Sequence, residues 1–325
     1  MAPTPTVIPQ LFAPGDYEGY VALGNRCYPD YPGSVAEVRH QDEIWDPSKY
    51  FKRRIVVEQD GKIVGAGDLY HSRWTFQPDK YHLELKVDPD ARRRGIGRAM
   101  YDDLLAAARA RSGRELIAGV KESMTDGLEF ALHQGFAEAK RDWESRLDAE
   151  RFDFGAFAEA PRRVADAGIR ITTLADDLAT DSSALERIYE LDCDCARDVP
   201  STDPFTPLSF EDWRKEVMES PGSTPEAYYL AVSPEGRYLG LSNLWRSLED
   251  PTFIWQGLTG IRREARGKGI AMALKLKTVE YARAQGIREI KTWNDQRNQP
   301  MLRINEALGF VKQPAWIEMR KELAP

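Results

Sequence analysis

The pattern of hydrophobic and polar positions predicts the same succession of elements twice along the chain. β-Branched and aromatic residues come in short runs, which are interrupted by Asp60-Gly61 in the first half and by Glu235-Gly236 in the second. An acidic residue followed by glycine between two such runs favours a tight β-hairpin. A third strand follows each hairpin. The predicted strands are 54–58, 63–64 and 81–87 in the first half, and 228–232, 238–239 and 253–261 in the second.

A glycine-containing loop and then a helix follow each third strand directly. In both helices apolar residues recur three and four positions apart, which is the spacing of one helix face. A short strand, a second helix that ends at Gly-Phe, and a closing strand complete each half. The predicted apolar faces are Ile96, Ala99, Met100, Ala107 and Ala110, and Ile270, Ala273, Leu274, Tyr281 and Ala284. The later strands are predicted at 116–120 and 142–147 in the first half, and at 289–293 and 316–320 in the second.

The two halves are related by a sequence repeat. Segment 91–97 aligns with 265–271, an offset of 174 residues, and this register holds without a gap as far as the two Gly-Phe pairs. Such self-similarity indicates a duplicated domain. We therefore predict one domain over 1–150 and a second over 169–325. The linker over 151–168 contains three phenylalanines, which favour docking on a domain.

The loop between strand and helix carries the clearest chemical signal. It reads Arg92-x-x-Gly95-x-Gly97 in the first half and Arg266-x-x-Gly269-x-Ala271 in the second. The first turn of a helix has unpaired backbone N–H groups and the positive end of the helix dipole, and glycines let an anion approach the backbone. The loop therefore predicts a pyrophosphate cradle. Its spacing differs from those of the Walker loop and the Rossmann fingerprint.

This loop, with the strand before it and the helices after it, resembles the acetyl-CoA loop of the GNAT N-acetyltransferases. The resemblance covers nearly the whole chain, and the tandem layout is similar to that of two-domain members of the mycothiol synthase type, in which the C-terminal domain is catalytic. It implies an α/β (α+β) protein of two tandem GNAT domains, each a mixed, mostly antiparallel twisted sheet flanked by helices. It also implies acetyl-CoA as the cofactor. The residues implied to hold it are Val87, Arg92, Arg93, Arg94, Gly95, Ile96 and Gly97, and in the second half Ile261, Arg266, Gly267, Lys268, Gly269, Ile270, Ala271, Asn294 and Asn298.

Polar positions favour the second half as the working site. Asn298 matches the family asparagine that contacts the cofactor, and Asn294 lies on the same approach, whereas the first half has apolar residues at both positions. The tyrosine that many family members use as general acid is Asn305 here, and the usual glutamate base is Trp255. Asparagine supplies no proton at neutral pH. All four histidines lie in the first half, so a second-half base is a carboxylate, an ordered water or no group at all.

The acceptor wall of the second half is predicted in the acidic, proline-rich segment 192–207. Within it Asp194, Asp198 and Asp203 are candidates to attract a cationic amine, although a solvated acidic loop explains the segment equally well. Asp198 and Asn305 are the candidate catalytic residues. The Cys-x-Cys pair in the segment lacks a histidine partner in this half, so no metal site is predicted.

Composition limits the partners. The chain has 325 residues, of which 42% are hydrophobic and 30% charged, as expected for a globular protein of two domains. A net charge of -7 argues against duplex nucleic acid as a partner. Three cysteines give no disulfide framework, and neither a membrane span nor a secretory signal is visible, so we expect a cytoplasmic protein. The duplication makes the chain an internal pseudo-dimer, and we expect a monomer.

We therefore expect an N-acetyltransferase that moves acetyl from acetyl-CoA to a primary amine of a small molecule, by direct attack in a ternary complex. Three alternatives stay open. The first alternative is a CoA-binding sensor or scaffold without catalysis, the second is an acetyltransferase that acts on a protein amine, and the third is an enzyme with both halves active.

Overall fold

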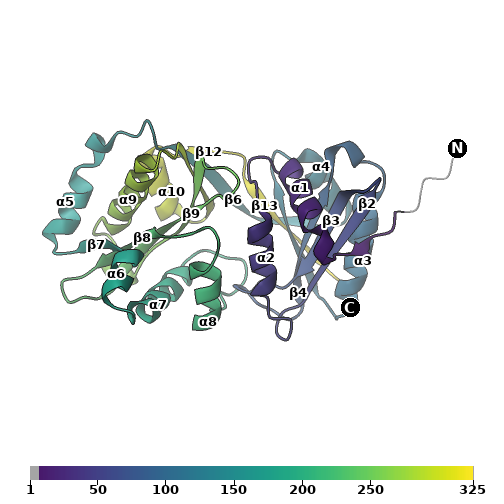
Figure 1. Ribbon diagram of the computed structural model, residues 1–325, viewed down its shortest axis with the longest axis horizontal. Helices are drawn as coiled ribbons and strands as arrows, with labels where there is room; N and C mark the ends of the chain where they lie inside the picture. Colours follow the sequence, from purple (N-terminus) through teal and green to yellow (C-terminus); the bar gives the residue numbers. More distant parts are fainter. Residues whose placement is uncertain (1–6, 325) are drawn as a thin grey trace. The chain divides into compact units, whose positions relative to one another are not determined.

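The computed structural model describes residues 7–324, which separate into two compact units (Figure 1). Unit 1 comprises the chain up to Arg141 together with the chain from Trp316 onward, and unit 2 comprises Asp142–Ala315. Each unit is a twisted sheet with helices against its faces, which confirms the predicted fold class. All described strand pairs within the units are antiparallel except one parallel pair in each.

Unit 1 has the strand order β1-β2-β3-β4-β5-β13. Its parallel pair is β4 with β5. The strands are β1 (Gln10–Leu11), β2 (Lys52–Gln59), β3 (Lys62–Tyr70), β4 (Lys80–Val87), β5 (Glu115–Lys121) and β13 (Trp316–Glu322). The helices are α1 (Tyr17–Cys27), α2 (Val35–Glu43), α3 (Ile96–Arg109) and α4 (Thr125–His133).

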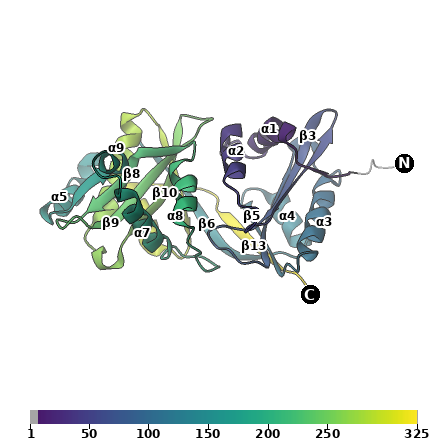
Figure 2. The same cartoon turned by 60° about the horizontal axis from the view of Figure 1, so that its bottom comes forward.

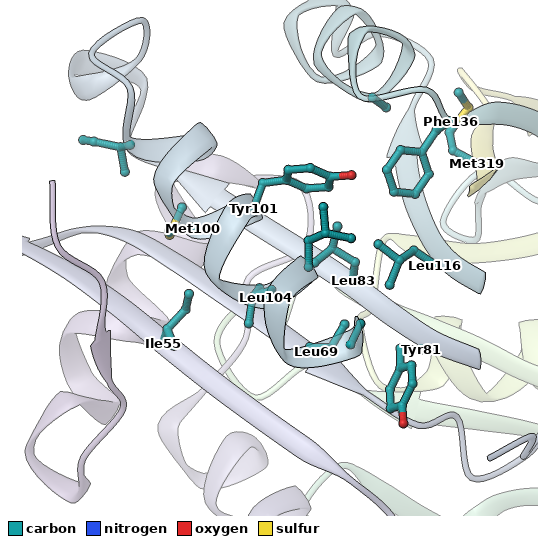
Figure 3. Close-up of a cluster of buried hydrophobic side chains, with 14 of the residues drawn as sticks. Ile55, Leu69, Tyr81, Leu83, Met100, Tyr101, Leu104, Leu116, Phe136 and Met319 are labelled. Carbon is teal, nitrogen blue, oxygen red and sulfur yellow. The ribbon is translucent and has the colours of Figure 1, made fainter. Parts of the chain in front are cut away.

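The core of unit 1 lies between α3 and the sheet (Figure 3). Met100 and Leu104 of α3 pack with Ile55 and Leu69, and all four side chains are fully buried. The predicted helix face is correct in its spacing but one position too long. Ala110 follows the last helical residue and is exposed.

Unit 2 has the strand order β6-β11-β10-β9-β8-β7, and β12 also pairs with β6. Its strands β6, β8, β9 and β10 are labelled in Figure 2. Its parallel pair is β10 with β11. The strands are β6 (Ala137–Asp148), β7 (Arg170–Thr173), β8 (Ser223–Val232), β9 (Tyr238–Arg246), β10 (Phe253–Ile261), β11 (Glu289–Asp295) and β12 (Val311–Lys312). The helices are α5 (Glu159–Asp166), α6 (Leu174–Thr180), α7 (Ala184–Ala196), α8 (Phe210–Trp213), α9 (Ile270–Ala284) and α10 (Gln299–Leu308).

The closing strands differ from the prediction in their partners. The segment predicted to complete the first half lies in β6, which pairs with β11 of unit 2 from Asp142 to Asp148. The C-terminal strand β13 pairs instead with β5 of unit 1. The alternation of side chains identifies a strand but not its partner, and a duplicated domain offers two equivalent places for each closing strand.

The linker predicted over 151–168 packs on unit 2. Phe152 is buried, its ring lies 4.8 Å from that of Phe154 and 5.3 Å from that of Phe157, and all three join the core cluster beneath α9. Helix α5 continues the segment and contacts α9.

Helices α7 and α9 cover opposite faces of the unit 2 sheet. Ile261 at the end of β10 packs with Ile270 and Leu274 of α9. A Cβ on the preceding residue, Gly260, would lie 2.4 Å from the Cβ of Cys195 on α7. Successive strand residues point to opposite faces, so β10 is held between the two helices.

Candidate active site

Strands β10 and β11 of unit 2 pair over only three residues and then separate. Phe253, Ile254 and Trp255 are in parallel register with Glu289, Ile290 and Lys291, and no later pair continues the ladder. A cavity of about 130 Å³ lies where the strands part. It is lined by Val199, Gly257, Leu258, Thr259, Lys275, Thr292, Trp293, Asn294, Asn298 and Met301.

A β-bulge faces this cavity. Gln256 is opposite Leu244 and Thr259 is opposite Ser242, so Gly257 and Leu258 together oppose the single residue Asn243 of β9. A bulge of this kind takes backbone groups out of the ladder and turns them elsewhere. The backbone of Gly257 and Leu258 is therefore available on the cavity side of β10.

Side chains from β10 and α9 hold the bulge in place. The Gln256 amide donates to the carbonyl of Asn243 at 2.7 Å and accepts a hydrogen bond from the Thr278 hydroxyl of α9 at 3.0 Å. At Gly257 a Cβ would lie 2.2 Å from Oδ1 of Asn243 and 2.4 Å from Nε1 of Trp245, so only glycine is accommodated. The hydrogen bonds of Gln256 and the requirement for glycine at 257 therefore fix the position of the bulge in the sheet.

The predicted anion loop leads from β10 into α9 with the expected backbone. Gly267 and Gly269 have φ of 78° and 81°, in the left-handed region that favours glycine. No heavy atom lies within 4 Å of a Cβ built on Gly267, and Arg266, Gly267 and Lys268 are exposed. The exposed loop and the first N–H groups of α9 therefore form an open cradle that suits a pyrophosphate.

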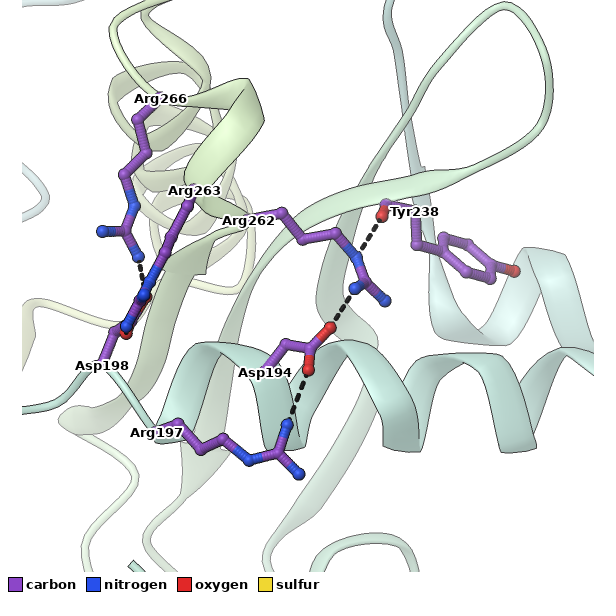
Figure 4. A network of polar contacts seen from close by, with 7 residues as sticks. All are labelled: Asp194, Arg197, Asp198, Tyr238, Arg262, Arg263 and Arg266. Carbon is purple, nitrogen blue, oxygen red and sulfur yellow. Dashed lines mark hydrogen bonds and ion pairs between the residues drawn. The ribbon is translucent and has the colours of Figure 1, made fainter.

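Asp198 lies against this loop rather than on an acceptor surface (Figure 4). Its carboxylate accepts hydrogen bonds from Arg263 and Arg266, which lower the pKa of Asp198 to about 2. Asp194 is similarly engaged by Arg262 and Arg197. Two of the three carboxylates expected to attract an amine are therefore already paired with arginines. A sequence shows an acidic segment but not the cations that fold against it.

Three asparagines that the sequence analysis names as candidate site residues lie close together at the cavity. Asn294 and Asn298 line it, and the Asn305 amide donates to Oδ1 of Asn294 at 2.6 Å. Asn298 caps α10 by accepting from the backbone N–H of Met301 at 3.4 Å. Oδ1 of Asn305 is buried and has no hydrogen-bond partner among the described residues. Asn305 thus orients Asn294 and leaves one buried acceptor available.

Lys275 is a site residue that the apolar spacing of the sequence does not predict. It lies on α9, lines the cavity and is only 1% exposed. Burial lowers the pKa of its ammonium to about 7. The sequence does contain a signal for this residue, because Lys275 interrupts the apolar pair Leu274 and Leu276 about one and a half helical turns after the anion loop.

The equivalent region of unit 1 is built differently. Its loop keeps the glycine geometry, with φ of 84° at Gly95, but β4 pairs with β3 without any register shift. Beside β4 a polar network fills the α1 side, in which Tyr20 donates to Asp68 at 2.8 Å and Arg54 donates to Asp68 at 2.7 Å. Arg93 of the loop pairs with Asp126 at 2.9 Å. Unit 1 therefore retains the anion loop and lacks the bulge.

The model of the acetyltransferase (GNAT) family matches residues 20–136 and 185–310, one match in each half. The chain belongs to this family. It is an acyltransferase with two GNAT domains in tandem, and GNAT acetyltransferases use acetyl-CoA.

Relatives and solved structures of GNAT proteins match most of the chain. It is 25% identical over 276 residues to "Mycothiol acetyltransferase" of Thermobifida fusca, covering 80% of this chain and 79% of that protein. The protein of the same name from Clavibacter michiganensis is 24% identical over 320 residues, covering 98% and 93%.

Two solved structures share the fold of this GNAT chain. A tandem GNAT protein from the clavulanic acid biosynthesis pathway has a TM-score of 0.77 at 22% identity, covering 98% of this chain and 99% of its own. A GCN5-related N-acetyltransferase from Sphaerobacter thermophilus has a TM-score of 0.69 at 20% identity, covering 98% and 96%. Among the described helices, none combines the length and apolar character that crossing a membrane requires.

Proposed function

We propose that unit 2 transfers an acetyl group from acetyl-CoA to a primary amine of a small molecule, and that unit 1 supports the fold without carrying the reaction. The observation behind this proposal is the succession of bulge, strand separation and open anion loop along one strand–loop–helix segment of unit 2. Unit 1 has the loop and a similar strand separation, since β4 and β5 pair only over Lys80–His82, but it lacks the bulge. Relatives named mycothiol acetyltransferase support a small molecule as the acceptor.

Each part of the site has a role that follows from its chemistry. Bound acetyl-CoA supplies an activated acetyl thioester. The backbone N–H groups of 267–271 hold its pyrophosphate, and Asn294 and Asn298 lie on the path of its pantetheine arm. The N–H groups at Gly257 and Leu258 stabilise negative charge on a carbonyl oxygen, because preorganised donors outside a ladder cost no reorganisation.

The acceptor side is aromatic rather than acidic. Trp255 and Trp293 face the α7 side of the sheet with ring centroids 5.1 Å apart, and Val199 closes the cavity there. Neither a carboxylate nor a histidine is among the residues that line the described cavity. The amine therefore enters in its neutral form, and positioning supplies most of the rate enhancement.

The test compares two matched loop variants. Gly269→Glu and Gly95→Glu place the same side chain at positions with φ of 81° and 84°. Acetyl-CoA-dependent thiol release is measured with a panel of small primary amines. We expect release by wild type and by Gly95→Glu, and its loss in Gly269→Glu. Release that persists in Gly269→Glu, or disappears only in Gly95→Glu, would overturn the assignment to unit 2.

A further inference from the structure

Lys275 is the only titratable side chain among the residues that line the described cavity of unit 2. It stands in the middle of α9, where the neighbouring buried positions are mostly apolar. The other polar side chains of the lining, such as Thr292 and Asn298, neither gain nor lose a proton near neutral pH. Any proton that a side chain exchanges in this cavity is therefore exchanged by Lys275.

The amine of Lys275 has no ionic partner. No described residue forms a hydrogen bond or an ion pair with its Nζ, and its one polar contact is the face of the Phe310 ring, 4.7 Å away. A buried ammonium without a counter-ion is costly, which is why such groups concentrate at functional sites. Burial lowers the pKa of this amine to about 7, so both protonation states are populated near neutral pH.

The repeat supplies an internal comparison. Tyr101 of unit 1 occupies the position of Lys275 at the 174-residue offset, and Phe136 occupies that of Phe310. The Tyr101 hydroxyl accepts a hydrogen bond from Lys321 at 2.8 Å, so its polar atom is satisfied within the unit. The corresponding position in unit 2 holds a lysine whose side chain lines the cavity. Packing therefore does not explain the choice of lysine.

The face of the sheet determines which reacting atom Lys275 can serve. Ile254 and Ile290 pack with Leu276 and Val279 of α9, so the α9 side of the sheet also carries Asn294 and Lys275. Trp255 and Trp293 alternate with these residues and lie on the α7 side, where Val199 follows the end of α7. The anion loop marks the side of the acetyl donor. A proton on Nζ is thus placed for the donor's leaving group and not for the acceptor amine.

We propose that the Lys275 ammonium donates a proton to the sulfur of the departing CoA. This role rests on the proposed function. The acceptor nitrogen uses its lone pair to form the new C–N bond, the C–S bond breaks, and its electron pair stays on sulfur. Lys275 Nζ gives one proton to that sulfur and becomes neutral. The acceptor nitrogen loses one proton to water, and water returns one proton to Lys275. Amine and thioester thus yield amide and thiol.

The first test observes the thiol of bound CoA and does not depend on turnover. Ultraviolet absorbance of the thiolate is followed against pH with CoA bound to wild type, Lys275→Met and Lys277→Met. Lys277 is on the same helix but pairs with Glu280 at 2.7 Å on the surface, which makes it a matched control. We expect a pKa of the bound thiol that is lower in wild type and Lys277→Met than in Lys275→Met.

Binding of desulfo-CoA, which lacks the sulfur, shows whether the variants are folded and separates two kinds of failure. Equal desulfo-CoA affinity in all three proteins, with the thiol pKa raised only in Lys275→Met, supports the role. Equal affinity with an unchanged thiol pKa overturns the role alone. Lack of desulfo-CoA binding by wild type overturns the proposed function and this role together. Lys275→Gln repeats the measurement if Lys275→Met does not fold.

Turnover supplies a second readout. In wild type kcat falls as the pH rises through the pKa of Lys275, because the donor must be protonated. Lys275→Met loses this limb, and its kcat drops by about 100-fold while KM for acetyl-CoA changes little. Stoichiometric acetylation of Lys275 by acetyl-CoA alone, seen by mass spectrometry of the intact protein, would show a nucleophile and contradict the role of proton donor.

Discussion

Replacing Lys275 by methionine is predicted to stabilise unit 2 and to do so in a pH-dependent way. The pKa of the ammonium is about 7 in the folded chain against 10.5 for an ordinary lysine. Because the folded value is lowered, the unfolded chain holds more protons between these two pH values, and stability rises with pH across that window. The cost of the buried charge is complete below pH ~7 and disappears above pH ~10.5.

The size of the effect follows from the same shift. A lowering from 10.5 to about 7 corresponds, at ~1.4 kcal/mol for each pKa unit, to about 5 kcal/mol of lost stability at pH 6. Methionine keeps most of the length of lysine, and such swaps in packed cores cost less than ~1.5 kcal/mol. We expect Lys275→Met to be more stable than wild type by about 3 kcal/mol or more at pH 6, and to be as stable as wild type or less stable by up to ~1.5 kcal/mol at pH ~10.5.

The assay is hydrogen exchange measured by mass spectrometry on peptides from α9 and β11, in wild type, Lys275→Met and Lys277→Met, between pH 6 and pH 10. Such peptides report the opening of unit 2 itself, whatever unit 1 does. A stability difference that is the same at every pH, or a Lys275→Met variant less stable than wild type at pH 6, would refute the buried, unpartnered ammonium.

Other predictions concern the loop, the bulge and its anchor. Asp198→Asn removes the carboxylate that pairs with Arg263 and Arg266 and so frees both arginines to bind phosphate. Because the pKa of Asp198 is about 2, this effect is expected at every pH above ~4. Calorimetry should show acetyl-CoA binding several-fold tighter at low salt, and weaker binding would contradict this. Gly257→Ala brings a Cβ to 2.2 Å from Asn243 Oδ1, and we expect loss of thiol release with CoA affinity within about three-fold of wild type, whereas full activity would show that the bulge is dispensable. Thr278→Val removes the hydroxyl that holds Gln256 and should lower kcat by about ten-fold at unchanged KM for acetyl-CoA, which steady-state kinetics would measure.

Local chemistry is predictable from the sequence because it depends on neighbours along the chain. The glycines at 267 and 269 and the anion loop they form follow from backbone geometry alone. The duplication aligns the two halves position by position, and this alignment singles out Asn294 and Asn298, which line the cavity of unit 2.

What the sequence leaves undetermined depends on contacts between distant segments. The partner of each closing strand, and the pairing of Asp198 with arginines more than sixty residues away, arise only when the chain folds. The bulge at Gly257 depends on register with β9, which a single strand does not encode. The burial of Lys275 is not predicted either, because a charged residue does not belong to the apolar pattern that identifies the buried face of a helix.

Native mass spectrometry with acetyl-CoA tests most directly whether unit 2 is the acetyl-CoA site. Wild type, Gly95→Glu and Gly269→Glu are compared at the same cofactor concentration. We predict that Gly269→Glu loses the cofactor molecule that supports thiol release, while Gly95→Glu retains it. Retention of that cofactor by Gly269→Glu, or no binding of acetyl-CoA to wild type, would contradict the assignment of the site to unit 2.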